Sequence, residues 1–233
     1  MKVRYDVLLC DADNTIFDFE QAEKNAFALT CAHLGMEATQ ELLDTYIQIN
    51  SALWKLLEQG GITQKVLRVR RFEQFLERIG RTDLDAAEIA AVYADSLGMQ
   101  SVPIEGAIEA VARWSRLLPV VIVTNGISRI QHGRMDGSPV KQYIRGMVIS
   151  EEIGAAKPDP KMLEMGMEMV GVTDKTRALM LGDSLSSDIA AAANAGVDAC
   201  WYNPKGAANT KGLPVRYEIR SLDEVDRILM GDA

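Results

Sequence analysis

The chain has 233 residues, of which 48% are hydrophobic and 25% are charged, and its formal net charge is -8. This composition is sufficient for a full hydrophobic core in one large domain, or in one domain that carries an insertion. The acidic balance argues against a broad basic face for a nucleic-acid polymer or for an anionic membrane surface, so an anionic ligand would need locally placed positive charge.

The three cysteines, Cys10, Cys31 and Cys200, are too few and too scattered for a disulfide framework or a zinc cluster. We expect reduced thiols in a cytoplasmic protein. The apolar run that precedes Asp11 is far shorter than a secretory core or a membrane span, so we predict no targeting segment and no membrane partner.

The first predicted element is a strand over residues 5–10, a short continuous apolar run of the kind found in parallel sheets that are covered on both faces. It leads into the sequence D-A-D-N-T, which sets Asp11 and Asp13 two positions apart. Adjacent carboxylates repel each other and a buried carboxylate needs a partner, so this sequence predicts a nearby cation.

The next part of the chain has helix-spaced apolar residues and no convincing strand. Four helices are predicted here, over residues 19–34, 40–57, 63–79 and 85–97. We therefore predict an all-helical cap over residues 18–100, inserted into a core formed by residues 1–17 and 101–233. On the third helix the arginines at 68, 70 and 71 are predicted to form mostly a solvated face, although one of them could reach over to an anionic substrate bound at the core.

The remainder alternates between the two kinds of element. Strands are predicted over residues 120–123, 147–149, 178–181 and 199–202, and helices over residues 105–117, 159–170 and 184–195. Asp159 and Pro160 suit the N-cap and the first position of their helix. These strand-helix units predict an α/β fold with a doubly wound, mainly parallel, Rossmann-like sheet core and an inserted all-helical cap domain.

Polar residues follow four of the predicted strands, and in a doubly wound sheet such positions meet in one crevice. They are Asp11, Asp13, Thr124, Asn125, Gly126, Lys157, Asp183 and Asp188. Carboxylate oxygens gathered in this way favour Mg²⁺, with a phosphate as a further ligand. Asp11 could then attack phosphorus, while Asp13 works as acid and then base. Asp188 could instead complement the dipole of the helix that it begins.

The loop after residue 123 would contribute the Thr124 hydroxyl and backbone N–H groups to the phosphoryl oxygens, with Gly126 permitting close approach of the backbone. Each motif alone is a common local pattern, and Lys157 with the two residues that follow could simply begin a helix. Their order and their shared position after strands favour a catalytic core.

Four sequences carry a resemblance to a known superfamily: D-A-D-N-T at 11–15, T-N-G at 124–126, A-K-P-D-P at 156–160 and G-D-S-L-S-S-D at 182–188. Together they resemble the four ordered motifs of the haloacid dehalogenase superfamily. The resemblance implies a Rossmann-like core with a helical cap after the first strand, and Mg²⁺-dependent phosphoryl transfer through a phosphoaspartate.

By position, Asp11 resembles the nucleophile of that superfamily and Asp13 its general acid/base, which also contacts the metal through its backbone carbonyl. Thr124 and Lys157 resemble the phosphate binders, and Asp183 the third metal ligand. Asp188 matches the last acidic position, which is often a water-mediated metal contact. Asp13 favours a phosphatase over a dehalogenase, which lacks this second acid, whereas a sugar-phosphate mutase or a non-catalytic module on the same fold stays open.

Further sequences, D-A-D-N-T-I-F-D-F, W-x-x-x-x-x-G-x-I-T and W-Y-N-P-K-G-A-A-N-T, look similar to the house-cleaning pyrimidine 5'-nucleotidases. This resemblance implies hydrolysis of nucleoside 5'-monophosphates, with Phe19, Trp54 and Arg71 as candidates for the wall of a nucleobase pocket. The alternative is a phosphatase for small metabolites such as phosphoglycolate or a sugar phosphate. In either case we expect a small-molecule phosphomonoester as partner, and a monomer or small homo-oligomer.

Overall fold

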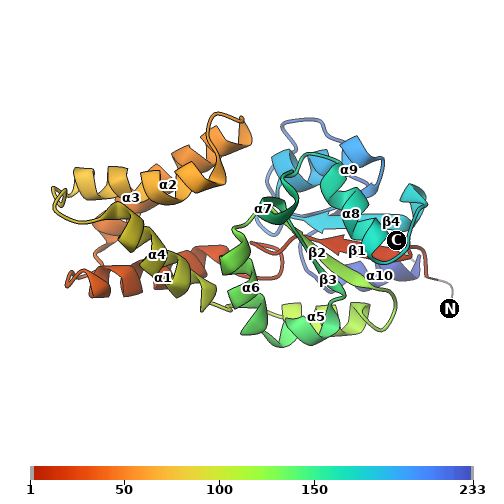
Figure 1. Ribbon diagram of the computed structural model, residues 1–233. Helices are drawn as coiled ribbons and strands as arrows, with labels where there is room; N and C mark the ends of the chain where they lie inside the picture. The colour runs from red at the N-terminus through yellow and green to blue at the C-terminus, as the bar shows by residue number, and fades with distance from the viewer. Residues whose placement is uncertain (1–2, 232–233) are drawn as a thin grey trace.

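The computed structural model describes residues 3–231, so residues 1–2 and 232–233 of the predicted core lie outside the described part. Its centre is a six-stranded parallel sheet in the order β3-β2-β1-β4-β5-β6 (Figure 1). The strands are β1 (Val7–Cys10), β2 (Val120–Thr124), β3 (Gly146–Ile149), β4 (Ala178–Gly182), β5 (Asp198–Tyr202) and β6 (Tyr217–Ile219). The predicted α/β fold with a Rossmann-like sheet is confirmed.

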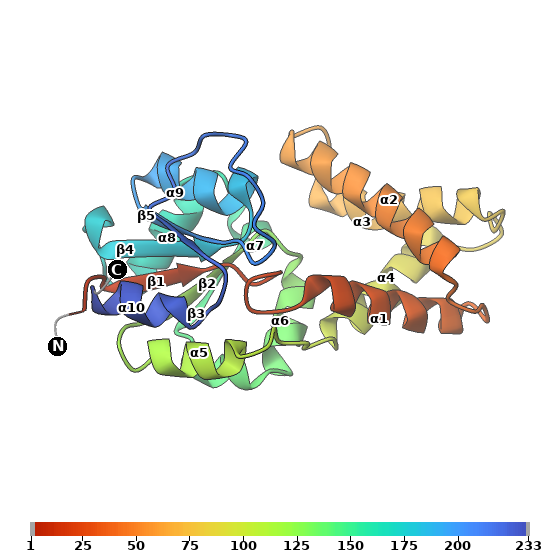
Figure 2. The same ribbon diagram turned by 180° about the vertical axis from the view of Figure 1, so that it is seen from behind.

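Helices cover both faces of this sheet (Figures 1 and 2). Leu8 of β1 packs into a hydrophobic cluster that includes α5 (Ala107–Trp114) and α10 (Glu224–Met230). Its neighbour Leu9 packs into a second cluster, which includes α8 (Lys161–Met169) and α9 (Ala190–Ala195). Because successive strand residues point to opposite faces, a strand covered on both sides must be apolar throughout, as β1 is.

Shorter elements connect the main ones. They are α6 (Ser128–Asp136), α7 (Ser150–Ile153), two 3₁₀ turns (Pro139–Tyr143 and Lys175–Arg177) and a π-helical turn (Leu185–Ile189) that leads into α9. The predicted start of α8, with Asp159 as the N-cap and Pro160 as the first helical residue, is one position too early. Pro160 is the N-cap residue and the helix begins at Lys161, although the Asp159 carboxylate still accepts a hydrogen bond from the Lys161 N–H at 2.9 Å.

Four helices lie between β1 and α5, beside the sheet (Figure 1). They are α1 (Phe19–His33), α2 (Gln40–Glu58), α3 (Gln64–Arg78) and α4 (Ala86–Gly98). Each is preceded by an N-cap residue whose side chain accepts a hydrogen bond from a first-turn N–H, namely Asp18, Thr39, Thr63 and Asp85. These helices share a hydrophobic cluster of their own. The division at residues 1–17, 18–100 and 101–233 stays a proposal.

Two connections join these four helices to the rest of the chain, and they run side by side. The Asp18 N–H donates to the Val102 carbonyl at 2.9 Å, and the Ile104 N–H donates to the Ile16 carbonyl at 2.9 Å. Beyond this point α4 packs on α6. A β-carbon added to Gly133 of α6 would lie 2.8 Å from the carbonyl oxygen of Gly98, so the two helix backbones are in direct contact.

Candidate active site

The carboxyl ends of β1, β2 and β4 lie next to one another because of the strand register. Cys10 of β1 pairs with Ile122 of β2 on one side and with Leu181 of β4 on the other. The chain winds outward in one direction from β1 and in the opposite direction from β4, so a crevice forms between these two strands. Predicted site residues end or follow each of these strands, namely Asp11, Thr124 and Asp183.

Lys157 reaches this crevice from the loop between α7 and α8. Its ammonium group donates to Asp11 Oδ1 at 2.5 Å, to Asp188 Oδ1 at 2.6 Å and to the Val123 carbonyl at 2.6 Å. The side chain is 1% exposed. Burial alone would lower the pKa of Lys157, but Asp11 and Asp188 together raise it, so the lysine is a fixed positive charge.

Asn125 holds the backbone of Lys157 in place. Its side-chain amide donates to the Lys157 carbonyl at 2.8 Å, and its side-chain oxygen accepts from the Lys157 N–H at 2.7 Å. The sequence predicts Asn125 as a substrate-binding residue, but it gives no sign that Asn125 also bonds to the backbone of Lys157. The asparagine that follows β2 therefore fixes the position of the lysine that follows β3.

Three carboxylates form a group that could hold a metal ion. One oxygen each of Asp11, Asp183 and Asp188 lies within 4.8 Å of the other two. Asp188 also accepts a hydrogen bond from the Ser184 N–H at 2.9 Å. Oxygen ligands of this kind suit Mg²⁺, which binds to one or two carboxylates and to substrate phosphate. The residues present therefore fit the predicted cofactor.

The pKa values of these carboxylates reflect an excess of negative charge. Burial raises the pKa of Asp11 well above its ordinary range; Lys157 opposes this rise, and Asp188 and Asp183 add to it. Burial, and next the charge of Asp188, raise the pKa of Asp183 to about 7. One ammonium group does not balance three carboxylates, so a bound divalent cation would favour their ionised forms.

The loop after β2 is folded tightly against the start of α6. The Thr124 hydroxyl oxygen accepts a hydrogen bond from the Gly126 N–H at 3.0 Å. A β-carbon added to Gly126 would lie 2.2 Å from the side-chain nitrogen of Gln131, so a glycine is required for Gln131 to pack here. Close approach is indeed a feature of Gly126, but the group that approaches in this structure is a glutamine side chain.

Asp13 is oriented by two residues of α6. Its carboxylate accepts a hydrogen bond from Gln131 Nε2 at 2.7 Å and forms an ion pair with Arg134 Nη1. Arg134 is fully buried, its guanidinium lies 4.9 Å from the ring centre of Phe17, and its Nε donates to the Gln100 carbonyl at 3.2 Å. The Asp13 side chain is not part of the carboxylate group described above, so metal contact through its backbone carbonyl stays a prediction.

Sequence reasoning does not identify Gln131 and Arg134. Both are polar residues in a segment whose few apolar residues give no strong helical pattern, and α6 itself is not predicted. The available signal is their spacing of three positions directly after T-N-G, which places both side chains on one face of a helix that starts at the crevice.

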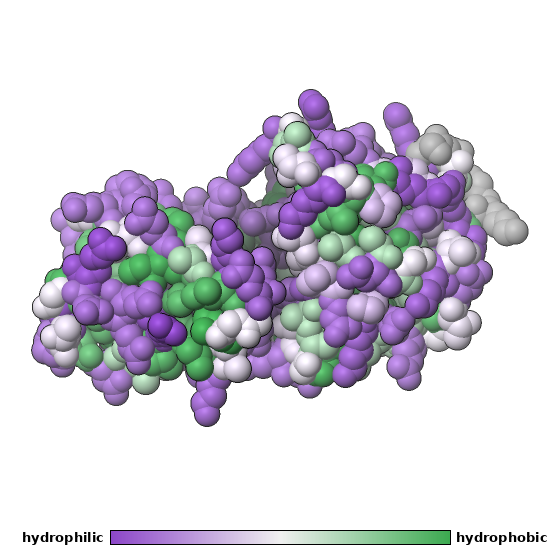
Figure 3. All heavy atoms as spheres, turned by 90° about the horizontal axis from the view of Figure 1, so that it is seen from above, coloured by the Kyte–Doolittle hydropathy of each residue, from purple (hydrophilic) through white to green (hydrophobic). Residues whose placement is uncertain are grey.

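A cleft with a volume of about 780 Å³ extends from these residues to the four inserted helices. Figure 3 shows this hollow between the two lobes of the molecule. The helical lobe consists of α1 to α4, and the core consists of the sheet and the helices that cover it. Its lining includes Asp11, Asp13, Lys157 and Asp183 on the sheet side, and Phe19, Trp54 and Arg71 on the helical side. The structure thus places all the predicted core residues and the three predicted wall residues around one cleft.

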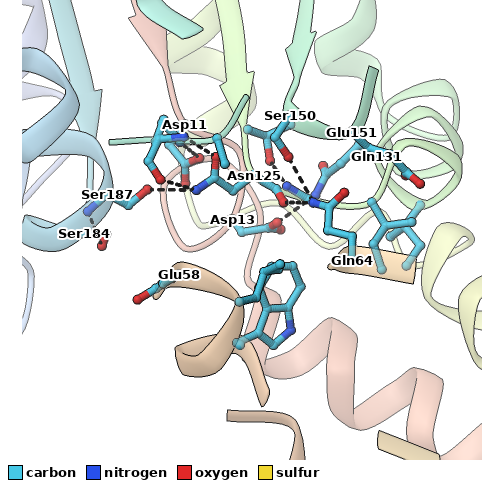
Figure 4. Close-up of a pocket in the computed structure, with 18 of the residues that line it drawn as sticks. Asp11, Asp13, Glu58, Gln64, Asn125, Gln131, Ser150, Glu151, Ser184 and Ser187 are labelled. Atoms are coloured by element: carbon cyan, nitrogen blue, oxygen red, sulfur yellow. Dashed lines mark hydrogen bonds and ion pairs between the residues drawn. The ribbon is translucent and has the colours of Figure 1, made fainter. Parts of the chain in front are cut away.

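The helical lobe also contacts the core across the mouth of this cleft (Figure 4). Gln64, the first residue of α3, donates from Nε2 to the Asn125 carbonyl and to Ser150 Oγ, at 3.0 Å each. One turn later, Arg68 forms an ion pair with Glu151. The expectation of a solvated arginine face is wrong for Arg71, which is buried, whereas Arg68 is partly exposed and Arg70 is exposed.

Comparisons with known proteins agree with this geometry. Residues 5–196 match the sequence profile of the haloacid dehalogenase-like hydrolases. The chain is 34% identical to the pyrimidine 5'-nucleotidase PynA of Streptococcus pneumoniae, over 95% of this chain and 93% of that protein. It is 29% identical to the pyrimidine 5'-nucleotidase YjjG of Escherichia coli, over 97% of this chain and 99% of that protein.

A solved structure is similar over nearly the whole chain. The HAD-hydrolase YfnB of Bacillus subtilis, crystallised with bound magnesium, superposes with a TM-score of 0.89 at 32% identity, covering 97% of this chain and 99% of that one. Within residues 3–231, no helix has both the length and the apolar character that a membrane crossing requires. From the motifs, the fold and these matches it follows that the chain belongs to the haloacid dehalogenase-like hydrolase family.

Proposed function

We propose that the protein is a Mg²⁺-dependent phosphomonoesterase that acts through a phosphoaspartate on Asp11, with pyrimidine nucleoside 5'-monophosphates as its substrates. The observation that carries this proposal is the convergence of Asp11, Lys157, Asp183 and Asp188 at the sheet edge, beneath a cleft closed by a helical lobe. The names of the relatives PynA and YjjG support the choice of substrate.

In the first step the carboxylate of Asp11 attacks phosphorus through the oxygen that Lys157 leaves free. A bond forms between that oxygen and phosphorus, and the bond between phosphorus and the ester oxygen breaks. Asp13 gives its proton to the departing ester oxygen, so the nucleoside leaves as an alcohol. Lys157 stays charged throughout and stabilises the negative charge near Asp11.

In the second step Asp13, now ionised, accepts a proton from a water molecule. The water oxygen bonds to phosphorus, the acyl-phosphate bond to Asp11 breaks, and inorganic phosphate is released. Gln131 and Arg134 hold the ionised form of Asp13, while Thr124 and the N–H groups after it are the proposed donors to the phosphoryl oxygens. Asp11, Asp183 and Asp188 would hold Mg²⁺, with the Asp13 backbone carbonyl as a further ligand, and the ion would supply positive charge for the phosphoryl oxygens.

The cleft supports a leaving group larger than a two-carbon acid. Its volume of about 780 Å³ lies within the usual range of roughly 300–1,000 Å³ for small-molecule sites. Phe19 and Trp54 line its helical side, and aromatic side chains of this kind can stack on a nucleobase. We further propose that the enzyme works in the cytoplasm as a monomer or small homo-oligomer, on a small-molecule substrate.

A second candidate is a phosphatase for a small phosphorylated metabolite. It is favoured by a 33% identity to the phosphoserine phosphatase of Thermus thermophilus, although that match covers only 65% of this chain. The two candidates share the same catalytic residues and differ only in the leaving group, so kinetics on a set of substrates distinguishes them.

The decisive test is phosphate release from UMP, dUMP, AMP, ribose 5-phosphate, phosphoserine and phosphoglycolate. We expect release to require Mg²⁺, to stop on addition of a chelator and to return with excess Mg²⁺, with the highest kcat/KM for the pyrimidine nucleotides. Asp11→Asn is the control for contaminating phosphatase. Activity that persists in chelator would contradict the proposed chemistry, and a preference for phosphoserine or phosphoglycolate would favour the second candidate.

A further inference from the structure

Three polar residues form a buried chain inside the helical lobe, and the mechanism above uses none of their contacts. They come from three different helices: Glu23 from α1, Asn50 from α2 and Arg71 from α3, with exposures of 7%, 4% and 2%. Asn50 Nδ2 donates to Glu23 Oε1 at 2.8 Å, and Arg71 Nη1 donates to Asn50 Oδ1 at 3.2 Å. Asn50 thus connects a carboxylate to a guanidinium.

Arg71 has donors that the protein does not use. Its Nε and Nη2 are buried and have no hydrogen-bond partner among the described residues. An unpaired buried donor destabilises a protein by roughly 1–3 kcal/mol, and more when the group is charged. The guanidinium rests on aromatic rings, 4.6 Å from the ring centre of Tyr93 and 5.3 Å from that of Phe72, which fixes its plane. A buried arginine that is rigidly held and only partly bonded needs a further acceptor.

The cleft that Arg71 lines can supply this acceptor. Phe19 and Trp54 line the same cleft, so a ligand in it can contact aromatic side chains as well as Arg71. At its other end lie Asp11 and Lys157. A phosphomonoester bound at Asp11 therefore extends its leaving group towards Arg71, and a planar ring with an oxygen acceptor fits both the aromatic side chains and the free donors.

The combined charge of Glu23 and Arg71 indicates which kind of acceptor group Arg71 can bind. With Glu23 ionised, the pair of Glu23 and Arg71 has no net charge, so a second anion here, such as the carboxylate of phosphoserine, would be buried without a counter-charge. A neutral carbonyl oxygen meets no such penalty. Pyrimidine bases carry a carbonyl group at C2.

From this geometry we infer that Arg71, held by Asn50 and Glu23, is a specificity residue that donates a hydrogen bond to a carbonyl oxygen of a pyrimidine base in the leaving nucleoside. The inference rests on the proposed function and adds the group that the enzyme recognises. Because buried donors are left unpaired when a ligand lacks the matching acceptor, substrates without a base should react much less efficiently.

The test compares dUMP with ribose 5-phosphate, which has a phosphate ester but no base. We expect Arg71→Met to lower kcat/KM for dUMP by about tenfold or more, mainly through KM, and to change kcat/KM for ribose 5-phosphate by less than about twofold. Asn50→Ala, which removes the support of Arg71, should show the same selective loss to a smaller extent. Arg70→Met is the matched control, because Arg70 is exposed on the same helix, and should behave like the wild type on both substrates.

Arg71→Lys serves as a second variant, since it keeps the buried charge above Tyr93 but lacks the planar pair of donors. Thermal unfolding of each variant shows whether it is folded. Equal losses on both substrates in the folded variants, or no loss on dUMP, would overturn the inference and leave the proposed function standing. A wild-type enzyme that does not prefer dUMP to ribose 5-phosphate would overturn both.

Discussion

One carboxylate oxygen of Asp11 accepts a hydrogen bond, and the other is available for attack on phosphorus in the proposed mechanism. Lys157 donates to Oδ1, and no described residue donates a hydrogen bond to Oδ2. In the proposed mechanism, a single lysine thus both neutralises the nucleophile and decides which of its oxygens can react. The same lysine is bonded to Asp188 and to the end of β2, so its position is set by three segments that are distant in the sequence.

Replacement of the nucleophile gives the first prediction. Asp11→Asn has nearly the same shape, but an amide does not attack phosphorus, so phosphate release from dUMP should fall by at least about 1,000-fold. Thermal unfolding should show a midpoint no lower than that of the wild type, because the substitution removes one of three mutually repelling carboxylates. Turnover near the wild-type rate would rule out the phosphoaspartate.

If Asp183 is a metal ligand, as proposed, Mg²⁺ binding should depend on pH. Its pKa of about 7 in the folded protein lies above the ordinary value of 3.8. Without metal, its contribution to folding stability is therefore present in full below the ordinary pKa and is lost as pH rises through about 7. Mg²⁺ requires the ionised carboxylate, so protons compete with the metal below that pH.

We therefore expect added Mg²⁺ to raise the thermal unfolding midpoint more at about pH 8 than at about pH 6. Differential scanning calorimetry of the wild type measures both shifts, with Ca²⁺-free buffers and a chelator as the metal-free reference. In Asp183→Asn the shift should be small at both pH values. Equal shifts for the wild type at the two pH values would contradict the role of Asp183 as a metal ligand.

At the scale of single elements, α6 supports Asp13, the proposed catalytic acid. It places Gln131 and Arg134 against Asp13, and Arg134 also bonds to the Gln100 carbonyl, in the segment that returns from the helical lobe. Since Arg134 is fully buried against Phe17, the carboxylate that it holds has little freedom to move. This short helix thus joins the acid to one of the two interlobe connections.

Loss of this support should affect protonation of the leaving group. We predict that Arg134→Met lowers kcat for dUMP by about 10- to 100-fold with little change in KM. For p-nitrophenyl phosphate, whose leaving group departs without protonation, the decrease should be much smaller. Arg145→Met, at an exposed position, is the control for the loss of a positive charge. Equal decreases on both substrates would show that Arg134 supports the fold and not the acid.

The elements that the sequence predicts well are those whose burial is uniform or strictly periodic. The strands of the sheet centre are continuous apolar runs, and α1 to α4 have clear apolar stripes behind Asp or Thr caps. By contrast, α6 buries a glutamine and an arginine, so hydrophobicity does not reveal it. The edge strand β6 and the C-terminal α10 are also absent from the predicted elements, because both are short and β6 is only partly buried.

The same contrast applies to the site. Asp11, Thr124, Lys157 and Asp183 are predictable because each follows a strand of a doubly wound sheet. The roles of Asn125 and Arg134 depend on contacts across the crevice, to Lys157 and Asp13, and such pairings have no local sequence signal. Arg71 lies among other arginines on its helix, and only the packing of three helices shows that it is the buried one.

At the scale of the whole molecule, polar contacts from α3 close the mouth of the cleft. Gln64 and Arg68 of α3 bond to Asn125, Ser150 and Glu151 of the core. An exposed ion pair such as that of Arg68 and Glu151 contributes only about 0–1 kcal/mol, so this closure at the mouth is held weakly. The related YfnB structure is described as showing interdomain movement, which fits a lobe that can open.

Removal of these contacts should favour the open arrangement. For the double variant Gln64→Ala with Arg68→Ala, we predict a several-fold increase in KM for dUMP and a larger radius of gyration by small-angle X-ray scattering, because closure depends on this interface. Arg78→Ala, at the exposed end of the same helix, is the control. An unchanged radius and KM would mean that other contacts hold the lobes together.

The contact between Gly98 and Gly133 has a consequence for how such an enzyme can change over time. Where the two lobes meet at this point, backbone lies against backbone, and neither glycine has a side chain that would have to be altered together with the interior of the pocket. Substitutions at positions such as Trp54 or Arg71 therefore leave this joint intact. Evolution can therefore change the chemical group that the enzyme accepts, while the contact between the two lobes at Gly98 and Gly133 stays the same.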